Sequence, residues 1–464
     1  SGLSLLRLSG TCEPALNVLL RGDRALWASF LITISGYSMV GLIACLYKKI
    51  LPVFSRPFLF LFFLFGIFFF EQVYISFKLY HWIQEYFLLR IVLAVLFFGG
   101  LDAARRNNIK LFESRFPKFG WMDFLIMAWI LGAFFYFLSE NFLITRQPYV
   151  DESSFWFVQA KDFVALDPLY REGTRYAHSS YGIPFIIAFP QVLFKTSFPQ
   201  GPYFMPIILI FILGGVLYEL RRDRWAFLFF LGLLLMTVNR HLWWQKLFFS
   251  LIYGEGLTAV FVLVLISELW WWKERGSKND TMELTILTFS IGLLFYTKMP
   301  SSYVFIAFLS VIFSIKKGKI SEKVFLFLLA CIPFLIWKLG SPVVNVPGIG
   351  GGVVFSFKNF RGMAGYLIKK YTAPMFFSFI SFLLVLFSFK KKELWFLFPL
   401  ISILLFIVLI YASILRNSEF ESSGRYIMHF MLGLYFLGAI AFSRLLNYFF
   451  DCRFKNFRLG KKYN

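Results

Sequence analysis

The chain has 464 residues, of which 59% are hydrophobic, only 16% are charged and 65 are Phe. A soluble protein of this size cannot bury so much apolar side-chain area and would expose large hydrophobic patches. With a mean hydropathy of +0.70, the composition excludes a soluble enzyme, a disordered chain and a fibrous repeat protein. We therefore predict an all-α, polytopic integral membrane protein.

The charge balance is strongly basic, with 47 Lys and Arg against 25 Asp and Glu and a net charge of +22. These basic residues lie in short segments between apolar runs. There they orient the chain and contact membrane lipids, and we expect no binding of nucleic acid. The four cysteines form no CxxC pair and no metal-ligand spacing, so neither a disulfide framework nor a zinc site is predicted.

Apolar runs predict the membrane-spanning helices, because a span needs about 20 mainly apolar residues. We expect about 13 transmembrane helices, at 26–47, 57–77, 84–101, 121–139, 203–220, 225–238, 257–272, 282–297, 299–314, 323–338, 373–389, 394–412 and 425–445.

Basic residues orient these helices, because cytoplasmic loops are enriched in Lys and Arg. Of the 47 basic residues, 27 fall in every second loop, near 48–56, 105–118, 221–224, 273–278, 316–323 and 390–392, and in the tail 444–462. The N-terminus is therefore predicted outside and the C-terminus inside. The segments 140–202, 239–256, 339–372 and 413–424 then lie outside.

The predicted organisation has four parts. An external segment, 1–25, precedes three transmembrane helices in 26–120, a membrane core in 121–338, and an external lid loop with C-terminal helices and a basic cytoplasmic tail in 339–464. The core contains the long external loop 140–202. Its apolar stretch 183–194 is only twelve residues long and includes Pro190, so we interpret it as a short interfacial or re-entrant helix.

Acidic residues at the external ends of spans are the candidate catalytic groups. Asp151 and Glu152 open the long external loop beside Phe155, Trp156 and Phe157, and Glu255 stands alone between two glycines at the start of a later span. Two carboxylates on one side of the membrane suffice for general-base catalysis or cation binding. The alternatives are a solvated pair in the loop and a simple helix-capping acid at Glu255.

Basic and aromatic residues on the same external side are candidate phosphate ligands. Arginine makes bidentate contacts to phosphate, although a lone cation at the membrane edge is more often a snorkelling anchor. The candidate substrate- and phosphate-binding residues are His178, Arg240, His241, Lys298, Arg416, Arg425 and Tyr426.

The order of four short motifs resembles the membrane-embedded GT-C glycosyltransferases, including protein O-mannosyltransferases and lipid A aminoarabinose transferases. VDESSFWFVQAK (150–161) is similar to the first-loop acidic motif of that family, and YGEGLTAVFVLV (253–264) to its second-loop acidic motif. GLLFYTKMPSSYVF (292–305) resembles its L-x-K-G-P-type segment, and GRYIMHF (424–430) its RY segment. The resemblance covers about 121–445, and three spans precede it here.

The resemblance implies an inverting transfer of a sugar from a polyprenyl-phosphate carrier to a lipid, glycan or protein acceptor. Asp151 would be the catalytic base, with Glu152 beside it and Glu255 in the second acidic motif. The cationic residues would stabilise the leaving phosphate. The predicted location is the bacterial inner (plasma) membrane, which the chain crosses several times, with the active site on the external, periplasmic side.

Other interpretations remain open at this point. A flippase or other transporter of lipid-linked glycans would have its charges inside the spans, and an O-antigen ligase or polymerase would have a large late external loop. No cofactor is required by the sequence. A divalent cation, Mg²⁺ or Mn²⁺, held by Asp151, Glu152 and Glu255 is the alternative to metal-independent chemistry.

Overall fold

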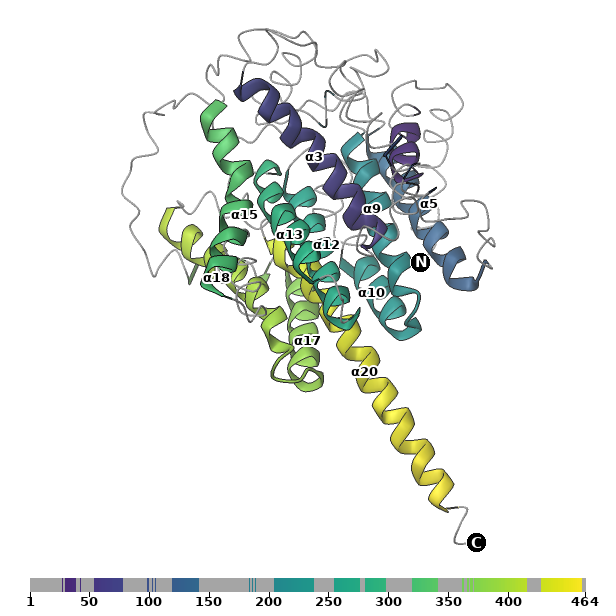
Figure 1. The fold of residues 1–464 in the computed structure, drawn as a ribbon. Coiled ribbons are helices and arrows are strands. Elements are labelled where there is room, and N and C mark those ends of the chain that lie inside the picture. Colours follow the sequence, from purple (N-terminus) through teal and green to yellow (C-terminus); the bar gives the residue numbers. More distant parts are fainter. Residues whose placement is uncertain are drawn as a thin grey trace.

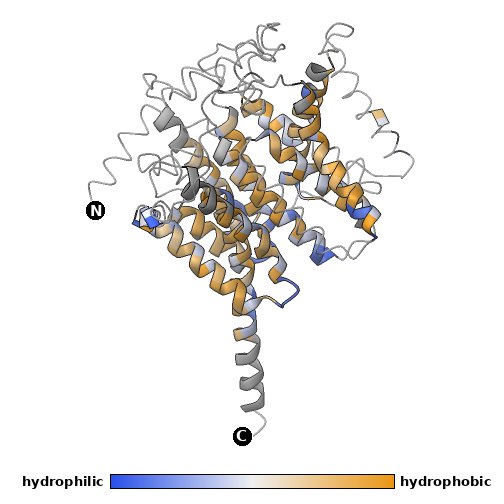
Figure 2. Ribbon diagram, turned by 90° about the vertical axis from the view of Figure 1, so that its left-hand side faces the viewer, coloured by the Kyte–Doolittle hydropathy of each residue, from blue (hydrophilic) through white to orange (hydrophobic). Residues whose placement is uncertain are grey.

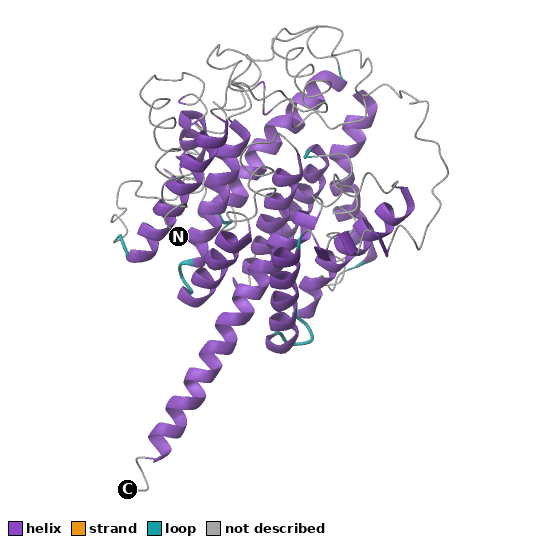
Figure 3. Ribbon diagram, turned by 180° about the vertical axis from the view of Figure 1, so that it is seen from behind, coloured by secondary structure: helices purple, strands orange, loops and turns teal. Residues whose placement is uncertain are grey.

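The computed structural model describes a helical bundle (Figure 1). The described residues are 27, 30–38, 42, 54–77, 98–99, 102, 105, 119–141, 183, 186, 188, 204–237, 254–275, 280–297, 319–340, 361–362, 365–366, 368–369, 371–414 and 427–460. Within these ranges the regular structure is entirely helical, with no strand (Figure 3). The predicted all-α class is confirmed for this part of the chain.

The helices coincide with predicted spans to within a few residues, apart from the end of the last one. Those of the N-terminal half are α3 (Arg56–Ser76), α5 (Trp121–Asn141), α9 (Phe204–Leu220), α10 (Arg224–Thr237) and α12 (Gly254–Arg275). They are followed by α13 (Asp280–Leu293), the 3-10 turn η4 (Leu294–Tyr296), α15 (Ile320–Gly340), α17 (Thr372–Ser388), the 3-10 turn η6 (Leu394–Phe396), α18 (Leu397–Ile414) and α20 (Met428–Gly460). The predicted spans 84–101 and 299–314 lie largely or wholly outside the described residues.

Two of the described helices are long and apolar enough to cross a membrane. The qualifying stretches are Gly256–Arg275 of α12 and Met428–Phe450 of α20. Apart from α15, the other described helices contain shorter apolar stretches, such as Trp121–Phe135 in α5 and Arg224–Thr237 in α10. An arrangement with thirteen spans therefore stays a prediction.

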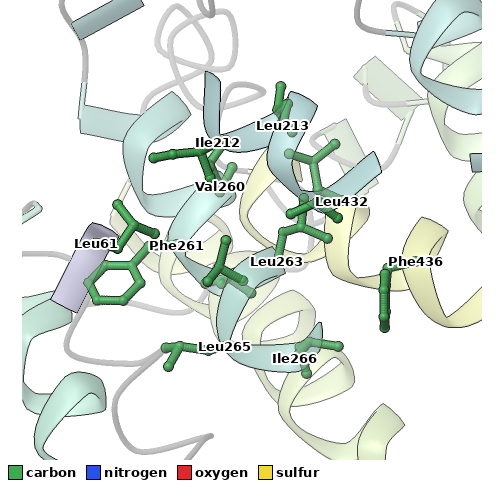
Figure 4. Packing of buried hydrophobic residues seen from close by; sticks show 14 of the residues in the cluster. Leu61, Ile212, Leu213, Val260, Phe261, Leu263, Leu265, Ile266, Leu432 and Phe436 are labelled. Atoms are coloured by element: carbon green, nitrogen blue, oxygen red, sulfur yellow. The ribbon is translucent and has the colours of Figure 1, made fainter. Parts of the chain in front are cut away.

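The core is built around α12. Figure 4 shows Leu61 of α3, Ile212 of α9 and Leu432 of α20 packed about Val260 and Leu263, and all five side chains are fully buried. Because α12 is apolar on every side, it packs against neighbours all round rather than along a single stripe. This central helix begins at Gly254 and therefore holds Glu255 in its first turn.

Close helix contacts depend on small residues. A Cβ atom on Gly292 of α13 would stand 2.3 Å from the carbonyl oxygen of Ala330 in α15, and one on Gly438 of α20 would stand 2.5 Å from the Cβ of Ser381 in α17. Such approaches are possible only where a side chain is missing. They fix α13 against α15 and α20 against α17.

The last helix is longer than predicted. The apolar run indicated 425–445, whereas α20 continues to Gly460 and projects from the bundle towards the C-terminus (Figure 1). Hydropathy detects only the part that needs an apolar environment, and the basic continuation keeps the same helical backbone. Part of the predicted basic tail is therefore helical.

Three residues of the predicted interfacial segment 183–194 are described. Ile183, Ile186 and Ala188 are helical and buried in the main hydrophobic core. Helix is confirmed at these three positions. The interfacial or re-entrant position of the whole segment stays a prediction.

Candidate functional site

Charged side chains from distant parts of the sequence gather at one end of the bundle, which we call the charged end. Arg221 at the end of α9 pairs with Asp123 in the first turn of α5. Asp223 accepts hydrogen bonds from the first backbone N–H groups of α10 and one, at 2.6 Å, from the Ser443 hydroxyl of α20. Hydrophilic turns are concentrated at this end, from which α20 projects (Figure 2).

A buried carboxylate joins α12 to α3 at the charged end. Glu268 is fully buried, accepts a hydrogen bond of 2.9 Å from the Ser55 backbone N–H, and pairs with Arg275 at 2.7 Å. A buried charge is tolerated when it is paired and hydrogen-bonded in this way. The contact ties the end of α12 to the start of α3.

A second carboxylate, Glu393, lies in the turn between α17 and η6. It pairs with Lys273 of α12 at 2.6 Å and with Arg444 of α20 at 2.8 Å, and accepts a hydrogen bond from the Lys390 backbone N–H. Burial raises the pKa of Glu393, but the hydrogen bonds and the nearby positive charges outweigh burial and lower it to about 2. The carboxylate is therefore ionised at neutral pH and joins three helices.

These contacts come from loops that the charge pattern assigns to one side of the membrane. The loops near 48–56, 221–224, 273–278 and 390–392 and residue Arg444 all contribute, although they are separated by as many as 220 residues. Their meeting is independent of the positive-inside argument, since it follows from packing. The structure thus brings these loops together at one end of the bundle, and their side of the membrane stays a prediction.

The helix ends that border the predicted site lie at the opposite end of the bundle. α5 starts at the charged end and so finishes at the opposite end with Asn141, ten residues before Asp151. α12 finishes at the charged end and so begins at the opposite end, with Glu255 in its first turn. α10 starts beside Asp223 and runs to Thr237, just before Arg240 and His241.

A buried hydroxyl pair connects two of the predicted site segments. The Thr258 hydroxyl donates a hydrogen bond of 2.8 Å to the Thr297 hydroxyl oxygen, which is bonded in turn to the Leu294 carbonyl. Thr258 lies one helical turn after Glu255 in α12, and Thr297 immediately precedes Lys298. The bond therefore places the helical turn of Glu255 beside the backbone that leads into Lys298.

The start of α20 lies at the same end. Ile266 of α12 lies against Gly433, and Trp271 contacts Phe436, so α12 and α20 run parallel. Gly254 lies twelve residues before Ile266, whereas Met428 lies only five residues before Gly433, so at a rise of about 1.5 Å per residue α20 begins about 10 Å further into the bundle than α12. Ile427 and Met428, which directly follow Arg425 and Tyr426, are fully buried there.

Most of the predicted site residues lie outside the described residues. These are Asp151, Glu152, His178, Arg240, His241, Lys298, Arg416, Arg425 and Tyr426. Glu255 is placed in the first turn of α12. The roles of all ten residues stay predictions. The structure places Glu255 at the opposite end of the bundle, together with the helix ends that adjoin Arg240, His241, Lys298, Arg425 and Tyr426 in the sequence.

Sequence reasoning missed a set of buried polar side chains at this end. Thr258, Thr297, His429 and Tyr435 are all fully or almost fully buried, and the Tyr435 hydroxyl donates a hydrogen bond to the Pro374 carbonyl at 3.1 Å. The sequence signal that could have found them is the presence of polar residues within otherwise apolar segments. Spacing alone could not pair Thr258 with Thr297, which are 39 residues apart on separate helices.

A metal site is not seen within the described ranges, where no group of three His, Cys, Asp or Glu side chains comes together. The two acids of the long loop, which would share a cation with Glu255, are outside those ranges. Metal-dependent and metal-independent chemistry therefore both stay open. Comparison of the chain with protein-family models, with curated proteins and with solved structures finds no match.

Proposed function

We propose that this protein is a multi-pass membrane glycosyltransferase that moves a sugar from a polyprenyl-phosphate carrier to a lipid, glycan or protein acceptor on the non-cytoplasmic face. The observation that carries the proposal is the Thr258–Thr297 hydrogen bond. It brings together two of the four motifs that resemble the GT-C enzymes, one with a carboxylate and one with a lysine. Those are the group types needed to activate an acceptor and to stabilise a leaving phosphate.

The outer surface supports insertion in a membrane. α5 exposes Trp121, Phe124, Met127, Leu131 and Phe135, which are spaced three or four residues apart and so form one face of the helix. α15 and α17 also expose several large apolar side chains. Continuous apolar faces of this kind suit contact with lipid. A protein that exposed them to water would be prone to aggregation.

The segregation of charge supports the enzyme over the flippase. In the described part of the chain, ion pairs gather at the charged end, whereas the Thr258 and Thr297 hydroxyls meet at the opposite end, in the segments whose sequence carries Glu255 and Lys298. A transporter would have ionisable groups along a path between the two ends. Among the described residues, the inner turns of α12 between Thr258 and Ser267 are apolar.

The test is transfer by the purified, vesicle-reconstituted protein. A panel of labelled polyprenyl-phosphate sugars is supplied with membrane lipids, glycans and peptides as acceptors, and both labelled product and released polyprenyl phosphate are measured. The proposal expects release of the carrier coupled to product. Movement of intact donor across the bilayer, without cleavage, would instead favour the flippase.

A further inference from the structure

The turn between α17 and η6 turns its acid inwards and its lysines outwards. Glu393 is buried by its contacts with Lys273 and Arg444, and Phe389 stacks on Trp270 with ring centroids 4.9 Å apart. Both anchors point into the bundle and fix the turn at the charged end. The three residues between them, Lys390, Lys391 and Lys392, are exposed, and we call them the lysine turn.

The positive charge of the lysine turn is not neutralised locally. Glu393 is the nearest acid in sequence, and its two oxygens are occupied by Lys273, Arg444 and the backbone N–H of Lys390. No ion pair joins a lysine of the turn to an acid among the described residues. The turn therefore presents three adjacent positive charges on a backbone that Phe389 and Glu393 anchor at its two ends.

Exposed aromatic side chains flank the lysines on the adjoining helices. Phe387 is 79% exposed at the end of α17, Trp395 is 46% exposed in η6, and Phe398 is 43% exposed at the start of α18. Aromatic rings of this kind favour the interface between acyl chains and headgroups, and lysines extend from there to the phosphates. The combination matches one chemical partner, which is a lipid with an anionic headgroup.

We propose that the lysine turn binds the phosphate headgroups of anionic lipids in the leaflet that borders the charged end. The proposal rests on the membrane insertion and orientation given above, but not on the proposed transfer chemistry. Each lysine near an anionic surface contributes about a fivefold preference, so three contribute on the order of 100-fold. The preference is electrostatic and falls at high salt.

Native mass spectrometry of the full chain in detergent tests this inference, with dioleoyl phosphatidylglycerol as the anionic probe and dioleoyl phosphatidylcholine as the neutral one. The test variant combines Lys390→Gln, Lys391→Gln and Lys392→Gln. The control combines Arg361→Gln, Lys369→Gln and Lys370→Gln, which removes the same charge from the sequence that precedes α17. Thermal unfolding by circular dichroism checks that both variants fold.

The expected result is that the test variant loses most of its preference for phosphatidylglycerol, while the control keeps it and phosphatidylcholine binding changes in neither. A test variant that binds phosphatidylglycerol within about threefold of the wild type would overturn the inference. So would a loss confined to the control variant, which would place the headgroup site in the sequence that precedes α17. Failure of the glycosyl-transfer assay would not change how these outcomes are interpreted, because lipid binding by the lysine turn does not depend on the transfer chemistry.

Discussion

Glu393 shows how a single carboxylate can make folding depend on pH. Its pKa falls from 4.5 in the unfolded chain to about 2 in the folded protein. Because the folded value is the lower one, the stabilisation is fully present above about pH 5 and is lost as the pH falls towards 2. A shift of this size corresponds to at most ~3 kcal/mol.

We expect Glu393→Gln to lower the melting temperature at neutral pH and to flatten its decline between about pH 5 and pH 2. The physical reason is that Lys273 and Arg444 lose the charge that holds them against the buried turn. Thermal unfolding in detergent across this pH range measures both effects. Glu274→Gln is the control, because Glu274 pairs with Arg444 but is 43% exposed and should matter little.

Asp151 is the residue on which the proposed chemistry depends most. Asp151→Asn keeps the size of the side chain but removes the base, so folding should survive while transfer falls by at least about 10²-fold. The measurement is the rate of labelled product formation by the reconstituted protein. Activity within a few-fold of the wild type would identify Asp151 as a solvated loop acid and make Glu152 the next candidate.

At the scale of elements, Gly292 marks a close approach between α13 and α15. Gly292→Ala would bring a methyl group against the Ala330 backbone, which cannot move away as a side chain can. We expect a loss of about 1–3 kcal/mol of unfolding free energy. Reversible unfolding in mixed micelles measures it.

Gly232→Ala is the matched control for this substitution. Gly232 is also inside a helix, α10, but a Cβ there meets nothing within 4 Å. Alanine should therefore be neutral or stabilising by up to about 1 kcal/mol, owing to its better helix propensity. Equal losses in the two variants would show that the cost arises from the helix itself and not from contact with α15.

Helix positions were predictable from the sequence, but neighbours were not. A run such as 204–220 is apolar throughout, so its helical extent is visible from hydropathy, and α9 follows it closely. Uniformly apolar helices, however, have no face that indicates which partner they meet. The contacts of Glu268 with Ser55, 213 residues away, and of Thr258 with Thr297 therefore needed the structure.

The candidate site was predictable only as a list of residue types on one side of the chain. The order of acidic and basic motifs named Glu255 and Lys298, and packing supplied the connection between their segments. The alternation of basic loops gave the common side. The charge pattern could not show how far along the bundle axis each residue lies, because that position follows from contacts between helices, such as Ile266 with Gly433.

At the scale of the whole molecule, the orientation of the bundle predicts what can be labelled from outside the cell. Cysteines introduced singly at positions 153 and 254, in a chain whose native cysteines are replaced, should both react with an impermeant thiol reagent. The reason is that α5 and α12 have their other ends at the charged end. Labelling of only one position from outside would rule out a site that uses both Asp151 and Glu255.

α20 is one long helix that continues well beyond the bundle. Arg444 stands midway along it, sixteen residues after Met428 and sixteen before Gly460, so each half measures ~24 Å. The first half is clamped by α12 and α17, and the helix continues past Arg444 without a proline. Residues near Gly460 therefore lie ~24 Å along the helix from Arg444, away from the helices that pack around its first half, so the basic end of the chain is carried clear of the bundle.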